Sequence, residues 1–177
     1  MTITIRFWGV RGSIASPGKA TASVGGNTSC VEVCCGPTRL VLDAGTGIRR
    51  LGEALIADGP TTMTLLLSHL HWDHIQGLPF FVPAYLPGSE ITVVGAKTAE
   101  MTLEEALAHQ MRAPVFPVRL ADLAASLRYR HVRSGESFSF GEVTVRAAKL
   151  NHPGGVLAYR IDHAGKSVVY ATDTEHY

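Results

Sequence analysis

The strongest functional signal in this sequence is the segment Ser68-His69-Leu70-His71-Trp72-Asp73-His74. Three of the eight histidines fall within six positions, with an aspartate among them, directly after an apolar run. His69 and His71 are two residues apart at a predicted strand end, so their side chains can point the same way and bind one metal ion. Asp73 and His74, beyond the turn, are displaced toward a second ion. Imidazole and carboxylate suit Zn, Mn or Fe. The alternative is a polar loop whose histidines make incidental hydrogen bonds.

Two polar residues further along the chain fit the same site. His152 lies in a tight loop, LNHPGG (150–155), and Asp173 ends the segment SVVYATD (167–173). Both follow predicted strands, and ligands in α/β sheets gather at the C-terminal ends of strands. A single histidine is more often a surface or core residue. Beside the histidine cluster, however, both residues are predicted to bind metal.

Asp43 stands at another predicted strand end, in LDAGTG (42–47), before a glycine turn. Metal-bound histidines usually have a hydrogen-bond partner on their second ring nitrogen. Asp43 is therefore predicted to orient a ligand imidazole or to accept hydrogen bonds around the site. The alternative is that Asp43 caps the helix predicted to begin near Gly47.

The periodicity of apolar residues predicts one domain, residues 1–177, in which strands and helices are mixed. Strands are predicted at 2–9, 29–35, 38–45, 62–69 and 90–96, and helices at 47–59 and 98–112. After Pro114 four more strands are predicted, at 126–133, 137–150, 155–162 and 167–173. Residues 10–28, rich in Gly, Ser, Ala and Pro, are predicted to form a loop. This order fits an α/β protein with a mixed sheet system.

Composition and charge narrow the classes of function. With 46% hydrophobic and 18% charged residues, the 177-residue chain has ample material for one core. Its formal charge of +1 offers no broad electrostatic reason to bind nucleic acid or an anionic membrane. No run approaches the ~20 apolar residues of a membrane span, and the N-terminus has no signal-peptide pattern, so a cytoplasmic protein is expected. Cys30, Cys34 and Cys35 are expected to be small, buried residues without a disulfide.

At this point the chain resembles the metallo-β-lactamase superfamily. The resemblance lies in HLHWDH (69–74), with DAGTG (43–47) before it and NHP (151–153) and ATD (171–173) after it. GVRGS (9–13), GGNTSC (25–30) and QGLPFF (76–81) are similar to the branch of ribonuclease Z-like and phosphonate-pathway phosphodiesterases. The resemblance implies an αββα sandwich with mixed sheets that binds two divalent ions, Zn or Mn.

The resemblance also implies a role for each ligand. His69, His71 and His152 would bind the first ion, Asp73 and His74 the second, and Asp173 would bridge both. Asp73 would also act in catalysis by orienting the nucleophilic water.

The family's remaining histidine ligand and its general-acid histidine lie further downstream than Tyr177. The chain is therefore expected to be a C-terminally truncated member with a weaker second metal site. His176 is a candidate substitute ligand. The strand predicted at 167–173 would lack its covering layer, which favours a homodimer.

These features together predict a two-metal phosphodiesterase that acts on a small phosphodiester or cyclic nucleotide. Long RNA is disfavoured because it calls for a basic groove. The alternatives are a lactone or thioester hydrolase on the same ions, and a metal-binding module without catalysis. Backbone N–H groups of residues 11–13 and 25–28 are candidates to contact a phosphate. The apolar residues 78–86 would either line the substrate pocket or pack beneath the sheet, and the segment 101–118 would either border the cleft or act as cover.

Overall fold

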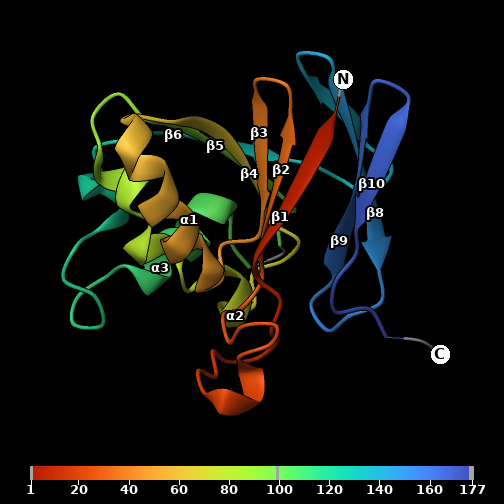
Figure 1. Ribbon diagram of the computed structural model, residues 1–177. Coiled ribbons are helices and arrows are strands. Elements are labelled where there is room, and N and C mark those ends of the chain that lie inside the picture. The colour runs from red at the N-terminus through yellow and green to blue at the C-terminus, as the bar shows by residue number, and fades with distance from the viewer. Residues whose placement is uncertain (1, 99, 176–177) are drawn as a thin grey trace.

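Two β-sheets packed face to face form the centre of the structure, and helices cover the outer side of the first sheet (Figure 1). The computed structural model describes residues 2–98 and 100–175, so His176 lies outside the described residues. Among the described residues no helix covers the outer face of the second sheet, and three layers of the expected αββα order are present. None of the helices in these ranges is both long and apolar enough to cross a membrane.

The first sheet has six strands, which run in chain order from β1 to β6. They are β1 (Ile3–Gly9), β2 (Cys30–Cys35), β3 (Thr38–Leu42), β4 (Thr62–Leu66), β5 (Glu90–Gly95) and β6 (Ser126–His131). The first two pairings are antiparallel, and the pairings from β3 to β6 are parallel. The loops that follow β3, β4, β5 and β6 therefore all leave from the same edge of the sheet.

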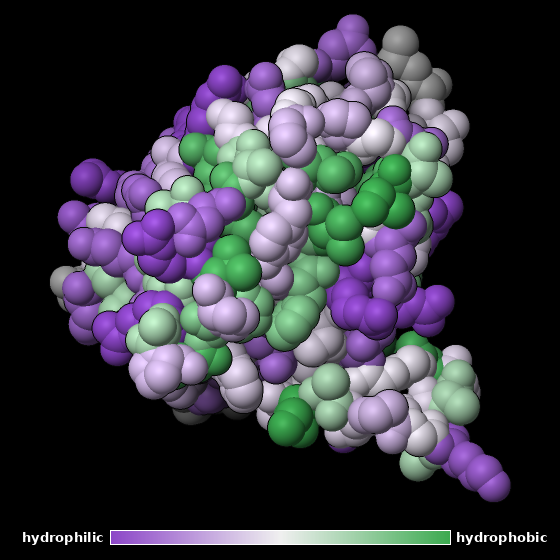
Figure 2. Space-filling model, turned by 90° about the vertical axis from the view of Figure 1, so that its left-hand side faces the viewer, coloured by the Kyte–Doolittle hydropathy of each residue, from purple (hydrophilic) through white to green (hydrophobic). Residues whose placement is uncertain are grey.

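The helical layer consists of α1 (Gly47–Leu55) and α3 (Leu103–Gln110), while the short α2 (Trp72–Ile75) lies near the edge just described. A capping box at Thr102 and Glu105 begins α3, four residues after the start predicted at residue 98. Figure 2 shows the helix-covered side of the molecule, where hydrophobic residues gather in the middle and polar residues surround them.

The second sheet is antiparallel, with the strand order β10-β9-β8-β7. Its strands are β7 (Ser137–Phe140), β8 (Val143–Leu150), β9 (Val156–His163) and β10 (Lys166–Tyr170). The prediction of a single strand over residues 137–150 is wrong, because the chain reverses at Gly141 with φ 57°. Apolar residues alternate on both sides of this tight turn, at Phe138 and Phe140 and again at Val143 and Val145, and the only sign of the turn is the shift of one position at Gly141-Glu142. Residues 126–170 thus contain five strands, one more than predicted.

Alternation along the parallel strands divides the core in two. Val41, Leu65 and Val93 face the helices, whereas their neighbours Leu42 and Leu66 face the second sheet. Residues 63–67, at β4 and just after it, are all buried, as expected for a strand covered on both faces. The strands predicted at 38–45 and 62–69 end earlier, at Leu42 and Leu66, because the residues that follow them turn away to form the site.

Candidate metal centre

The structure brings the six predicted ligands together at the edge where the parallel strands end. His69 and His71 lie in the loop between β4 and α2, and Asp73 and His74 lie in α2 itself. The second sheet contributes the other two ligands, His152 from the loop between β8 and β9 and Asp173 from the segment after β10. Both sheets are therefore needed to build the centre.

His69, His71 and His152 form the first group. One ring nitrogen of each lies within 4.8 Å of the others, and His152 Nε2 is 3.0 Å from His71 Nδ1. Ligand atoms around one tetrahedral ion at about 2.1 Å are roughly 3.4 Å apart. The spacing of these imidazoles is of that order, so the group fits a single metal ion.

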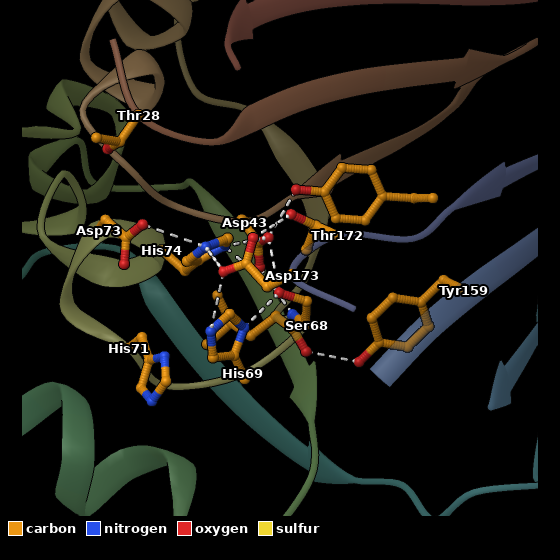
Figure 3. A network of polar contacts seen from close by, with 12 residues as sticks. Thr28, Asp43, Ser68, His69, His71, Asp73, His74, Tyr159, Thr172 and Asp173 are labelled. Carbon is orange, nitrogen blue, oxygen red and sulfur yellow. Dashed lines mark hydrogen bonds and ion pairs between the residues drawn. The ribbon is translucent and has the colours of Figure 1, made fainter. Parts of the chain in front are cut away.

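His69, His74 and Asp173 form the second group, which shares His69 with the first. Asp173 Oδ2 lies 3.0 Å from His74 Nε2, 3.5 Å from His69 Nε2 and 3.9 Å from His152 Nε2. Figure 3 shows the Asp173 carboxylate directed at both His69 and His74. One oxygen therefore faces members of both groups, as a carboxylate shared between two ions would.

Asp73 lies beside His74, on the far side of that ring from the first group of histidines (Figure 3). Its Oδ2 is 3.5 Å from His74 Nε2 and accepts a hydrogen bond of 2.7 Å from the backbone N–H of Ser13. Ser13 adopts φ 67°, a left-handed conformation that turns this N–H toward the carboxylate. The loop of residues 10–28, which is distant in sequence from HLHWDH (69–74), thus fixes the position of the Asp73 carboxylate.

Asp43 is fully buried and accepts four hydrogen bonds. The backbone N–H of Ser68 donates to Oδ1 at 2.7 Å, while Ser68 Oγ, Tyr170 Oη and His74 Nδ1 bond to Oδ2 at 2.7–2.8 Å. Asp43 does not cap α1, whose N-cap residue is Thr46. The side chain therefore orients an imidazole of the centre.

These hydrogen bonds also determine which ring nitrogens face the centre. Because Ser68 Oγ gives its only proton to Asp43, it accepts from His69 Nδ1, 3.0 Å away. His74 donates through Nδ1 to Asp43. In both rings Nε2 is the nitrogen that remains to bind a metal ion.

The surroundings of His69 and His74 shift their pKa values in opposite directions. Burial and the nearby His74 lower the pKa of His69 to about 4, so this ring is neutral at neutral pH, as a ligand must be. Burial also lowers the pKa of His74, but its hydrogen bond to Asp43 and the charges of Asp43, Asp73 and Asp173 outweigh burial and raise it to about 9. The three carboxylates thus draw positive charge to this point.

The residues present fit divalent metal ions. His69 Nε2, which faces the centre, is a buried atom without a hydrogen-bond partner among the described residues, although buried polar atoms are nearly always paired. The four imidazoles and two carboxylates around it form a donor set suited to Zn or Mn.

Sequence reasoning missed Ser68 and Tyr170, and it expected the backbone N–H of Ser13 to contact a phosphate rather than a carboxylate of the centre. Ser68 and Tyr170 support Asp43, and Ser13 holds Asp73 through its backbone N–H. Ser68 lies inside the histidine motif, so its place there was a usable signal. Tyr170 had none, because a tyrosine in a predicted strand is most simply explained as core.

Residues in two of the predicted contact segments have partners within the protein. Most of residues 78–86 are buried or half-buried, and Phe80, which is exposed, stacks edge-to-face on Phe116. The backbone N–H of Thr28 donates to Thr46, so it is engaged within the protein. The cysteines form no disulfide; Cys30 and Cys35 are buried, whereas Cys34 is half-buried.

Comparison with known proteins gives the following relationships. Residues 38–177 match the family described as Beta-lactamase superfamily domain. A ribonuclease Z from Mycobacterium avium (strain 104) is 27% identical over 188 residues, covering 97% of this chain and 63% of that enzyme. Among the ribonucleases Z that it matches, the chain spans between 31% and 63% of their length.

Two solved structures share the fold. The metallo-beta-lactamase fold protein YhfI from Bacillus subtilis superposes with a TM-score of 0.71 at 18% identity, covering 99% of this chain and 64% of YhfI. The short form of human tRNase Z superposes with a TM-score of 0.63 at 17% identity, covering 95% of this chain and 68% of that enzyme. The predicted fold is thereby confirmed.

Proposed function

The chain belongs to the beta-lactamase superfamily, and from this we propose that it is a two-metal hydrolase of small phosphodiesters. The observation that carries the proposal is the position of Asp173 Oδ2, which faces His74 at 3.0 Å, His69 at 3.5 Å and His152 at 3.9 Å. A carboxylate in this position can be shared by two ions, with His71 completing the first site and Asp73 the second.

The reaction is the attack of water on phosphorus with cleavage of one P–O ester bond; the alkoxide leaves and takes up the proton that the water gives up, which yields a phosphomonoester and an alcohol. Two bound divalent ions supply a water of lowered pKa and neutralise charge on the phosphoryl oxygens. Asp73 is the residue we assign to orient this water. Its Oδ2 is held by Ser13, while Oδ1 accepts no hydrogen bond from the described residues, so it is open to the water.

The remaining residues of the centre keep the ligands in place. Asp43 and Ser68 hold the rings of His74 and His69, so little reorganisation is needed when charge develops at phosphorus. The half-buried carboxylate of Asp173 keeps a pKa below its ordinary value; burial opposes ionisation, but the hydrogen bond from Thr172 and the adjacent His74 favour it. It is therefore available as an anionic ligand at neutral pH.

The preference for a phosphodiester has two supports. One is the relationship to ribonuclease Z, and the other is the number of carboxylates beside the imidazoles, which suits two ions rather than one. The formal charge of +1 favours a small substrate over long RNA.

The test compares wild-type protein with His71→Ala and with His109→Ala, a matched variant of an exposed histidine on α3. Elemental analysis of protein purified without chelator should find two ions per wild-type chain. The His71 variant should lose the first ion and at least about 100-fold in the rate of bis(p-nitrophenyl) phosphate hydrolysis. The His109 variant should keep both properties.

Equal metal content in the two variants would contradict the ligand assignment. Hydrolysis of a lactone or a thioester, with none of bis(p-nitrophenyl) phosphate, would replace the phosphodiesterase by another hydrolase on the same ions. Bound metal without turnover of any of these esters would replace it by a metal-binding module.

A further inference from the structure

A cavity of about 410 Å³ opens directly beside the first group of histidines. His69 and His71 contribute to one wall. The other walls come from the loops that follow β5 and β6 and from the hairpin between β8 and β9. The cavity is thus continuous with the metal centre, and the loops after β5 and β6, which the mechanism described above does not use, form part of its wall.

Three cations surround this cavity. Lys97 follows β5, Arg133 follows β6 and Lys149 lies near the end of β8. Glu100 is the one acidic residue among the described lining residues, so the fixed charges, three positive and one negative, sum to +2. The whole chain carries only +1. Positive charge is therefore concentrated at this cavity in a protein that is otherwise close to neutral.

These cations are also available to a ligand. All three side chains are exposed, and within residues 2–98 and 100–175 none of them makes an ion pair. Elsewhere on the surface, Arg130 and Arg160 are paired with Glu136 and Asp162. Backbone hydrogen bonds lower the pKa values of Glu105 and Glu136, and the charges of Lys97 and Arg133 lower them further without forming ion pairs. The positive charge at the cavity is therefore compensated only in part.

The remaining lining of the cavity is mostly apolar. Leu70, Val132, Val156 and Leu157 contribute hydrocarbon surface between the histidines and the cations. A volume of about 410 Å³ lies within the range of small-molecule sites, roughly 300–1,000 Å³. This combination suits a compact organic group that ends in an anion.

We propose that the cavity is a specificity pocket for the second anionic group of the substrate. The substrate is then a phosphodiester in which one ester group is nucleotide-sized and carries a further phosphate. The reactive phosphorus lies at the metal centre, and the further phosphate lies among Lys97, Arg133 and Lys149, where no bond to it is formed or broken. This inference rests on the proposed function, because it takes the adjoining centre as the place of hydrolysis.

The experiment measures binding, so that it does not depend on turnover. Isothermal titration calorimetry of metal-loaded protein compares an adenosine bisphosphate with an adenosine monophosphate. The bisphosphate should bind about tenfold more tightly, because its additional phosphate reaches the cations of the cavity, whose exposed side chains each contribute little. Arg133→Gln combined with Lys149→Gln should bring this ratio close to one, and higher salt should lower it in the wild type.

Arg146→Gln and Lys166→Gln are the matched controls. Both residues are exposed cations on the second sheet that do not line the cavity, and they should leave the ratio within about twofold of the wild type. Thermal melts of all variants check that the fold is retained. Tight binding of a single-stranded oligonucleotide, without binding of the mononucleotides, would overturn the proposal.

This experiment distinguishes failure of the proposed anion pocket from failure of the proposed phosphodiesterase reaction. A ratio near one in the wild type, or a ratio unchanged by the double substitution, overturns the pocket even where phosphodiesters are hydrolysed. A high ratio that depends on Arg133 and Lys149 supports the pocket even if no phosphodiester is cleaved, in which case the proposed reaction is what fails.

Discussion

Asp43 is the residue that links the metal ligands to the rest of the protein. Asp43 is fully buried. Its carboxylate accepts hydrogen bonds from the backbone N–H and Oγ of Ser68, from His74 Nδ1 and from Tyr170 Oη. Burial and the adjacent Asp43 raise the pKa of Tyr170, so its hydroxyl stays protonated and serves as a donor. A buried carboxylate depends on such donors, because each one that is removed leaves part of the charge uncompensated.

Tyr170→Phe tests this dependence. Loss of the hydroxyl should lower the free energy of unfolding by about 1–2 kcal/mol. It should also weaken metal binding about tenfold, because His74 is oriented through Asp43. Chelator competition measures the metal affinity, and a urea titration measures the stability.

Tyr85→Phe is the matched control for this substitution. Tyr85 Oη donates to the carbonyl of Pro79 at 2.6 Å, away from the metal centre. The control should lose stability without losing metal affinity. Equal metal affinities in the two variants would contradict the role assigned to Tyr170.

At the scale of elements, the site depends on a close approach of backbones. A Cβ on Gly77 would lie 2.0 Å from the carbonyl oxygen of Gly45, and a Cβ on Gly45 would lie 2.4 Å from that of Asp73. The loop after β3 is therefore packed directly against α2 and the residues that follow it. This contact keeps Asp43 beside His74.

Gly77→Ala should disrupt this contact. The new methyl group meets backbone, which cannot rotate away, so we expect a loss of about 3 kcal/mol or more. For a chain of this length that corresponds to a melting temperature lower by about 6 °C or more. Gly12→Ala, at a glycine with open space around it, should be tolerated. Similar melting temperatures for the two variants would show that the approach is looser than described.

The elements also show where periodicity succeeds and where it fails. The strand and helix types over residues 2–131 were predicted with shifted ends, because apolar spacing reports which face of an element is buried. Three features escaped it: the turn at Gly141, the early end of β4 at Leu66 and the short helix α2. The turn at Gly141 is local but interrupts the alternation by a single position, whereas the residues after Leu66 and in α2 are placed by contacts with distant parts of the chain, such as Asp43 and Ser13.

At the scale of the whole molecule, the candidate metal centre lies where the two sheets meet. His69 and His74 follow β4 of the first sheet, whereas His152 and Asp173 come from the second. Metal ions bound by these four residues would stabilise the folded state, because only the folded chain brings the four residues together. The predicted homodimer and cytoplasmic location stay predictions.

Removal of metal should therefore lower the stability of the entire chain. At a free metal concentration of about 1,000 times the dissociation constant, binding contributes about 4 kcal/mol, equivalent to about 8–16 °C in melting temperature. Differential scanning calorimetry with and without chelator measures the shift. His152→Ala should reduce it, whereas His109→Ala should preserve it. A chelator effect that is the same in all three proteins would show that the ions do not connect the sheets.

The sequence by itself determined the fold family and the six candidate ligands. Four of these ligands lie in one segment of six residues, where local geometry alone keeps them near each other, and the other two follow strands that apolar alternation reveals. Only the tertiary structure decided how the ligands are supported and what lies beside them. Asp43 meets Ser68 across 25 positions and Tyr170 across 127, and Lys97, Arg133 and Lys149 meet only around a cavity. Apolar periodicity specifies which face of each element is buried, whereas sheet pairing and packing determine which distant residues become neighbours.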